Sequence, residues 1–391
     1  MSCGGNLVKN GSRILHRQSI RRETVEKVQR WFCPACKASF SKRKQINSGV
    51  RTHFTKIFVD EVVRDFIQGR SPCGVIKERK NISRGTVSSW VNQYGGRCYT
   101  PKQVSVALRF RTHNRWGGIL LLDGKYLNRN LVLLLAVDCL TLDIVSWLVA
   151  QRETVAGYIR LVDSVEACGY VIGALISDGH PAIASLTREP KLILIRKYTR
   201  TYPRPGVAPA QPAQRPRLDG VPHQLCLVHA ERDLASLVSK LPKKSRKILL
   251  SLSHQVLYAK NLKQALKRRR KLATVSALLP PAYHDCSLWI SDHWEALTAH
   301  HLTRVGGKRV PGTSNEGENI ISYLNARLKT IKRLRNLKSA ANITNLIIMN
   351  YRFKPLENSK NKLKRNKTPL ELVIGKKLTS TWTDFINKST A

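Results

Sequence analysis

The spacing of apolar residues along the chain changes near residue 117. Before this point, between residues 57 and 94, they recur every three or four positions, which predicts amphipathic helices. After it they form short continuous runs, which predict buried strands at 118–123, 130–138 and 144–150. An amphipathic helix over 154–167 and a fourth strand over 170–177 follow. The chain therefore predicts a helical N-terminal unit joined to an α/β unit with the order β-β-β-α-β.

The helical unit has the layout of a helix-turn-helix. Gly69 ends its first helix, and Ser83 is placed to cap the third. A recognition helix presents its early polar residues to base edges. In this chain those residues are Arg84, Thr86, Ser88 and Ser89. The alternative is a three-helix packing unit with no role in DNA binding.

Carboxylates stand at the ends of two predicted strands. Asp123 closes the first strand and Asp178 follows the fourth. Three antiparallel strands, a crossover helix and a parallel fourth strand begin a ribonuclease H-like fold, in which the first and fourth strands are neighbours. The two carboxylates would then share divalent metal, because Mg²⁺ prefers oxygen ligands. The alternative is that both acids only form turns at strand ends.

A third carboxylate is expected from the segment 312–329. Thr313 or Ser314 is placed to cap a helix there, and Glu316 and Glu318 both lie in its first turns. Two carboxylates are usually too few for a site that binds two metals and transfers a phosphoryl group. Helical periodicity does not choose between Glu316 and Glu318.

The net charge of the chain indicates a polyanionic binding partner. The chain has 68 lysines and arginines against 25 aspartates and glutamates, a net charge of +43. Residues 116–186 invert the balance, with 4 basic and 7 acidic side chains, whereas 239–271 has 12 basic and no acidic ones. Such an excess is typical of proteins that bind a polyanion, and it excludes a typical metabolic enzyme. The acidic stretch is then the candidate active site, because its carboxylates can hold cations that bridge to phosphate.

A cysteine pair near the N-terminus predicts a zinc ribbon. Cys33 and Cys36 form a CxxC knuckle between aromatic residues, and Cys3 resembles the second half of another knuckle. Either the coding sequence begins upstream, or His16 completes the site, or the site has lost a ligand. The alternative is a pair of buried structural thiols.

Four blocks of the chain together resemble the Mutator-like DDE transposases and their bacterial insertion-sequence relatives. The blocks are Leu121–Tyr126, Ser177–Ile183, Gln224–Leu234 and Thr313–Glu318. The resemblance implies a ribonuclease H-like core with an all-helical insertion, and it selects Glu318, three residues after Asn315, as the third carboxylate. It also matches a family Cys-x-x-His pair to Cys226 and His229. Residues 187–222 depart from it as an extra surface excursion.

We therefore expect a DDE transposase that binds transposon ends and carries out metal-dependent DNA cleavage and strand transfer. Asp123, Asp178 and Glu318 would hold two Mg²⁺ or Mn²⁺ ions, with structural Zn²⁺ at the N-terminus. The partners would be terminal inverted repeats, target DNA and at least one further copy of the chain, since two ends are paired. The alternatives are a non-catalytic DNA-binding regulator derived from a transposase and a structure-specific nuclease.

The expected organisation has six parts. They are a zinc-ribbon-like segment (1–45), a helix-turn-helix domain (46–98), the first part of the ribonuclease H-like core (116–230), a helical insertion (231–309), the final core helix (310–355) and a basic tail (356–391). No apolar run approaches the roughly 20 residues of a membrane span. We expect a cytoplasmic, nucleoid-associated protein, or a nuclear one in a eukaryote.

Overall fold

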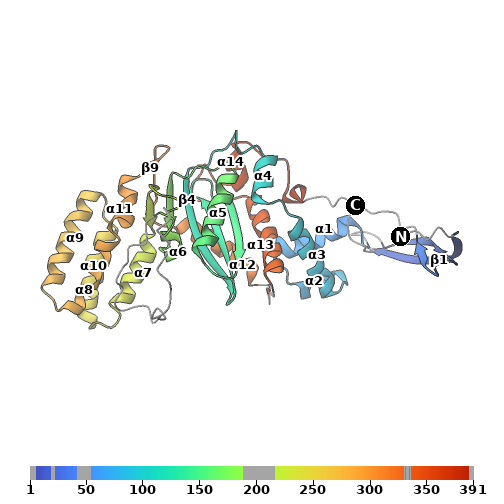
Figure 1. Cartoon of the computed structure of the whole chain (residues 1–391), viewed down its shortest axis with the longest axis horizontal. Coiled ribbons are helices and arrows are strands. Elements are labelled where there is room, and N and C mark those ends of the chain that lie inside the picture. Colours follow the sequence, from blue (N-terminus) through green and yellow to red (C-terminus); the bar gives the residue numbers. More distant parts are fainter. Residues whose placement is uncertain are drawn as a thin grey trace.

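The computed structural model describes residues 6–18, 23–41, 54–187, 216–329, 331, 334 and 336–386. Cys3 and most of the expected excursion, residues 188–215, lie outside the described residues. Helices α1–α3, a central sheet and a group of helices that includes α8–α10 follow one another along the long axis of the molecule (Figure 1).

A five-stranded mixed sheet forms the centre of the α/β unit, and its strand order is β6-β5-β4-β7-β8. Its strands are β4 (Ile119–Asn128), β5 (Leu131–Asp138), β6 (Ile144–Ala150), β7 (Ala174–Ser177) and β8 (His223–Leu225). The first three are antiparallel neighbours, and β7 runs parallel to both β4 and β8. The predicted β-β-β-α-β order is confirmed, since helix α5 (Val155–Ala167) separates β6 from β7.

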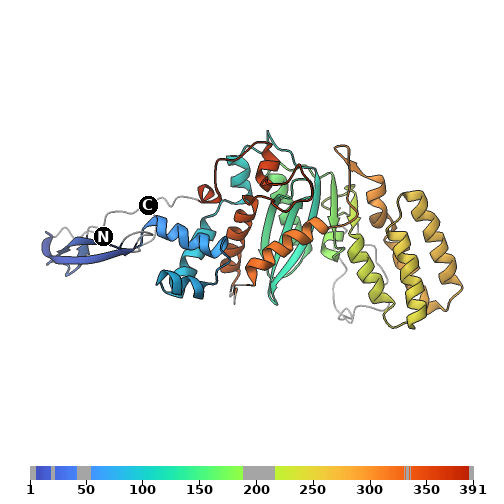
Figure 2. The ribbon, with the colours of Figure 1, turned by 180° about the vertical axis from the view of Figure 1, so that it is seen from behind.

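The two faces of the sheet contact different helices. Side chains alternate across a strand, so Leu120 and Leu122 of β4 join a core with α5, whereas Leu121 faces the opposite core. Helices α12 (Asn315–Leu328) and α13 (Leu337–Arg352) contribute to that opposite core. Seen from behind, α12 crosses in front of the sheet and α13 lies beside it, toward the N-terminal helices (Figure 2). The sheet is therefore buried on both sides, which explains its continuous apolar runs.

The helix-turn-helix prediction corresponds to α1 (Lys56–Ile67), α2 (Cys73–Lys80) and α3 (Arg84–Arg97). Ser83 caps α3 as predicted, because its hydroxyl accepts a hydrogen bond from the Thr86 amide at 3.0 Å. α3 continues through Gly95 and Gly96 to Arg97. α13 passes so close that a Cβ atom on Gly95 would lie 1.9 Å from the Asn342 carbonyl oxygen. The glycines therefore serve a close helix crossing inside α3.

This crossing joins the N-terminal helices to the α/β unit. Trp90 and Val91 of α3 belong to the same hydrophobic core as Leu346 and Ile347 of α13 and the outer strands of the sheet. Short helix α4 (Pro101–Ala107) continues from α3 toward α5, and Ser105 donates a hydrogen bond to the Cys168 carbonyl at 2.6 Å. The three N-terminal helices are packed on the core and are not suspended from a linker.

The insertion between β8 and α12 is helical, as expected. Its members are α7 (Leu227–Leu237), α8 (Lys243–Leu257), α9 (Leu262–Ala277), η1 (Pro281–Tyr283), α10 (Asp285–Asp292) and α11 (Trp294–Leu302). They share a hydrophobic core of their own that includes Leu249, Leu272 and Ile290. A two-stranded hairpin, β9 (Arg304–Val305) and β10 (Lys308–Arg309), leads back to the sheet.

The C-terminal segment, expected as a basic tail, is docked on the hydrophobic core. Helix α14 (Pro369–Ile374) forms with a full capping box between Thr368 and Glu371, and Leu370 is fully buried. Trp382 and Phe385 of η2 (Trp382–Phe385) are also buried. Apolar anchors thus outweigh the repulsion among the lysines of this segment over the described residues 356–386.

The N-terminal segment forms a three-stranded antiparallel sheet of β1 (Val8–Gln18), β2 (Glu23–Phe32) and β3 (Ser39–Ser41). No helix in the described part of the chain has the length and apolar character needed to cross a bilayer.

Candidate active site

Asp123 and Asp178 lie level with each other on neighbouring parallel strands. The pairing of β4 with β7 runs from Ile119 opposite Ala174 to Leu121 opposite Ile176. Two residues further along, this register sets Asp123 opposite Asp178. β4 continues to Asn128 beside β5, so Asp123 lies within β4, two residues past its last pair with β7, and not at the strand end that the sequence predicted.

Burial and a neighbouring carboxylate disfavour the charged form of Asp123. Burial is the main cause that raises the pKa of Asp123 to about 7, and the neighbouring charge of Asp178 adds to it. A hydrogen bond from the Gly124 amide to Asp123 Oδ1, at 2.7 Å, acts in the opposite direction. Asp178 Oδ1 accepts a hydrogen bond from the His180 amide at 2.9 Å. A cation between these groups would relieve the repulsion, so the pair fits a hard divalent ion.

Helix α12 brings Glu318 to the same place. Gly317 lies against Leu121, two residues before Asp123, and a Cβ atom there would lie 2.8 Å from Leu121 Cδ2. Glu318 and Asp123 line one pocket of about 420 Å³. Glu316, the other sequence candidate, acts electrostatically on Cys139 and Tyr351 and does not line this pocket. The helix geometry thus separates two acids that periodicity left equivalent.

Cations also line this pocket. Lys125 follows Asp123 on β4, Lys329 lies one turn beyond Asn325 on α12, and His229 enters from α7. Carboxylates surrounded by lysines provide oxygen ligands at the centre and positive charge at the rim. Such an arrangement can hold metal ions and a phosphate backbone together.

Cys226 connects the starts of α7 and α12. Its buried sulfur accepts hydrogen bonds from the Ser314 amide at 3.3 Å and the Ser314 hydroxyl at 3.1 Å. Burial alone would raise the pKa of the Cys226 thiol, but interactions with His229 and Ser314 outweigh it and lower the pKa to about 7. The interaction with Cys226 in turn raises the pKa of His229. Ser314 is at the predicted cap position, yet its hydroxyl serves the cysteine and not the helix end.

Glu153 is a fourth acid at this site and was not among the predicted site residues. Its carboxylate fills the space beside Gly124, where a Cβ atom would lie 1.4 Å from Glu153 Oε1. Its other oxygen lies 2.9 Å from His180 Nε2, and only 7% of its side chain is exposed. His180 Nδ1 accepts a hydrogen bond from the Ala182 amide, so the imidazole caps α6 (Pro181–Ala184). The sequence feature that could have indicated it is Gly124, directly after Asp123, because a residue without a side chain leaves space for the side chain of another element.

The predicted DNA-contacting residues lie away from this pocket, on α3. Arg84, Ser88 and Ser89 are exposed and Thr86 is half-buried, while Val87 and Trp90 face inward. The front half of α3 is thus accessible, and its second half packs on α13. Asn315, the auxiliary residue of the third block, is exposed in the first turn of α12.

The cysteine knuckle forms the turn between β2 and β3. The Cys33 amide donates to the Ala38 carbonyl at 2.9 Å, Cys33 is buried and Cys36 is exposed. The alternative that His16 completes a zinc site was wrong. His16 pairs with Val25 in the β1–β2 ladder, eight residues along β2 from Cys33. At the usual strand rise this is roughly 26 Å, far beyond a metal–ligand distance.

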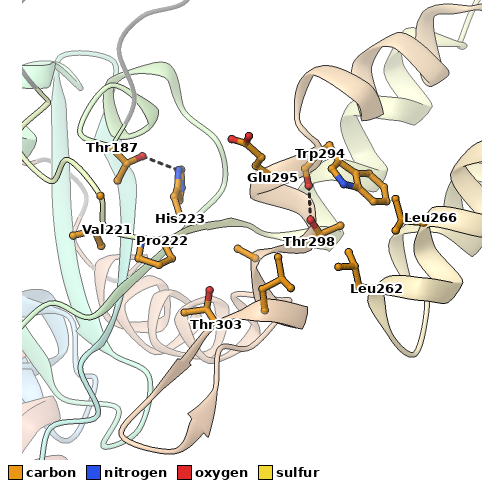
Figure 3. Close-up of a pocket in the computed structure, with 13 residues that line it drawn as sticks. Thr187, Val221, Pro222, His223, Leu262, Leu266, Trp294, Glu295, Thr298 and Thr303 are labelled. Atoms are coloured by element: carbon orange, nitrogen blue, oxygen red, sulfur yellow. Dashed lines mark hydrogen bonds between the residues drawn. The ribbon is translucent and has the colours of Figure 1, made fainter.

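A second cavity lies elsewhere in the described structure. It measures about 550 Å³ and opens between β8, α9 and α11, with Leu262, Leu266 and Trp294 on its helical side (Figure 3). His223 on the opposite wall lies 3.4 Å from the Thr187 hydroxyl. None of the predicted site residues lines it.

Within the described ranges, no three His, Cys, Asp or Glu side chains are close enough to form a preassembled metal cluster. The proposed ligands come from β4, the residue after β7, and α12, and the Glu318 side chain points toward Arg232 at 3.6 Å. Oxygen ligands on three elements fit Mg²⁺ in their chemistry, and Glu318 would turn inward to complete the set. No model of a known protein family matches the chain, and no curated protein gives a significant match.

Proposed function

We propose that this protein is a DDE transposase, which binds the ends of a mobile element and cuts and joins DNA at the site of Asp123, Asp178 and Glu318. One observation carries the proposal. Asp123 and Asp178 face each other across neighbouring parallel strands, and α12 brings Glu318 into the pocket that Asp123 lines.

The sheet supports a ribonuclease H-like interpretation. Numbered within the sheet, the strand order is 3-2-1-4-5, with the first and fourth strands parallel, as expected for that fold. Ligands commonly bind at the carboxyl ends of strands in open α/β sheets. Asp178 directly follows β7 and Asp123 lies beside that end of β7 on β4. Lys125 and Lys329 line the same pocket as Asp123 and would neutralise phosphate charge.

The reaction would proceed in two displacements. First, a water oxygen bonds to phosphorus, the bond to the 3′ oxygen breaks, and this oxygen takes up a proton and leaves as a 3′ hydroxyl. Second, that hydroxyl loses its proton and bonds to a target phosphorus, and the displaced 3′ oxygen of the target takes up a proton. Two Mg²⁺ ions held by the three carboxylates would activate the attacking oxygen and stabilise the leaving one. The chain itself contributes positioning and charge neutralisation.

The test uses DNA that carries the inverted repeats flanking the coding sequence. With Mg²⁺, the wild type should nick at these ends, and Asp123→Asn, Asp178→Asn and Glu318→Gln should each abolish nicking while they keep DNA binding. Glu316→Gln is the matched control, since it removes the same charge two residues away and should nick normally. Normal nicking by Glu318→Gln, with loss in Glu316→Gln, would contradict the assignment of the third ligand.

A second readout separates the transposase from a nuclease. Nicked ends with a 3′ hydroxyl should join to a supercoiled target plasmid in the presence of wild-type protein. Nicking that is never followed by joining would favour a structure-specific nuclease. DNA binding with no nicking under any divalent metal would favour a DNA-binding regulator.

A further inference from the structure

Arg232 bridges the two helices that meet at the carboxylate pocket. It lies on α7, three residues after His229 and therefore on the same face of that helix. Its Nη1 atom lies 3.4 Å from His229 Nε2, and its Nη2 atom lies 3.6 Å from Glu318 Oε1 on α12. A guanidinium can only donate, so the imidazole nitrogen accepts. Both partners of Arg232 line the pocket that contains Asp123.

The contact with Glu318 involves the carboxylate that would complete the metal site. Asp123 is half-buried and fixed within β4, whereas the Glu318 side chain is 43% exposed and free to turn. While Glu318 faces Arg232, one of its oxygens is directed to a cation of the protein itself. A metal ion must therefore compete with Arg232 for this oxygen.

We propose that Arg232 is a positioning residue that exchanges partners: it holds Glu318 before metal is bound and turns to the scissile phosphate afterwards. The inference rests on the proposed function and deepens it. The planar fork of a guanidinium suits two oxygens of one phosphate, which a lysine ammonium does not match. Arg232 is 62% exposed at the pocket rim, so DNA can reach it without any rearrangement of the core.

The exchange predicts opposite effects of one substitution on two measurements. Removing Arg232 removes the competitor for Glu318, so Arg232→Ala should bind metal more tightly. Exposed ion pairs are weak, and the gain should be about two- to fivefold in the dissociation constant. The same change removes a phosphate contact, so nicking at saturating metal should fall on the order of 100-fold. If Arg232 had a purely structural role, its removal would weaken both metal binding and nicking.

The first measurement needs no DNA and no activity. Mn²⁺ binding to the full-length protein is followed by the electron paramagnetic resonance signal of the free ion, for wild type, Arg232→Ala and Arg232→Lys. Arg160→Ala is the control, because Arg160 is an exposed arginine of α5 and its loss changes the net charge equally. Tighter Mn²⁺ binding in Arg232→Ala alone supports the exchange. Unchanged or weaker binding in Arg232→Ala, or equal tightening in Arg160→Ala, overturns it.

The second measurement is nicking of end DNA at saturating Mg²⁺. Arg232→Ala should be slow, and Arg232→Lys should recover only part of the rate because it keeps the charge and loses the fork. Wild-type rates in Arg232→Ala overturn the phosphate contact. Absence of both Mn²⁺ binding and nicking in the wild type overturns the proposed function together with this inference, whereas an active wild type with unaffected Arg232 variants overturns the inference alone.

Discussion

Gly317→Ala tests whether the approach of α12 to β4 positions the site. The new Cβ atom would lie 2.8 Å from Leu121 Cδ2 and 2.9 Å from Leu121 Cδ1, whereas ordinary contacts begin at 3.4 Å. Leu121 is 1% exposed and cannot turn both methyl groups away. α12 must then move by about 0.6 Å or more, and Glu318 moves with it while Asp123 stays in β4.

The free energy of unfolding is a weak readout of this change. Overpacking costs about 1–3 kcal/mol, whereas alanine in place of glycine in a helix gains up to about 1 kcal/mol. The net loss is therefore at most about 3 kcal/mol. Catalysis is more sensitive, because a misplacement of about 1 Å can lower a rate on the order of 100-fold. We expect Gly317→Ala to fold, to bind end DNA normally and to nick it on the order of 100-fold more slowly.

A second substitution should rescue the first. Valine lacks both Cδ atoms, so Leu121→Val removes the clash. The double variant should therefore nick at least about tenfold faster than Gly317→Ala alone. In urea unfolding, the double variant should lose about 0.5–2 kcal/mol less than the sum of the single changes. Gly74→Ala is the control, since a Cβ atom there meets only Arg84 at 3.8 Å. Wild-type nicking by Gly317→Ala, or strict additivity with Leu121→Val, would refute the reasoning.

Three further predictions follow from the charges. Burial and Asp178 raise the pKa of Asp123 above its unfolded value, so the folded state binds this proton more tightly and loses stability as the pH rises from about 4 to about 7. In metal-free urea unfolding Asp123→Asn should therefore be more stable than wild type at pH 8 and equal to it below pH 4; wild-type stability at pH 8 would contradict the shift. Arg352→Ala should lower the free energy of unfolding by about 3–5 kcal/mol, because it leaves the charge of Asp143 buried and unpaired. Arg352 donates two hydrogen bonds to the fully buried Asp143, at 2.7 and 2.9 Å. A loss under 1 kcal/mol would contradict this. Arg84→Ala should weaken binding to end DNA and lower its salt dependence by about one charge with no change in unfolding, and unaltered binding would remove α3 from the DNA interface.

The order of the strands was predictable because the apolar runs are long and separated by polar turns. Two local features were not. The first strand was predicted to end at Asp123, yet β4 continues through Gly124, whose backbone pairs with Leu134 and whose missing side chain leaves space for Glu153. The second is Gly95 inside α3, where the close crossing of α13 could not be predicted. In both places a distant part of the chain packs closely against the glycine, and the local sequence does not show which part that is.

Only those site residues that a single sequence block identifies could be predicted. Asp123 and Asp178 could be named because each adjoins a strand, but the choice of Glu318 over Glu316 depended on a family resemblance. The side chains that tune the site come from separate elements: Glu153 precedes α5, Arg232 is on α7, and Ser314 bonds to Cys226 across 88 positions. Contacts at such separations leave no periodic trace in the sequence.

The crossing of α3 and α13 at Gly95 and Asn342 has a consequence for the DNA. If α3 reads bases and the carboxylates cut, the protein core fixes the number of base pairs between the two positions, and no linker can stretch to accept another. An insertion of five base pairs between the recognised sequence and the cut would rotate the cleaved bond to the opposite side of the duplex. The protein would then recognise the distance between the bound sequence and the cleaved bond as well as the sequence itself. The ends of the element could change in sequence more easily than in this distance.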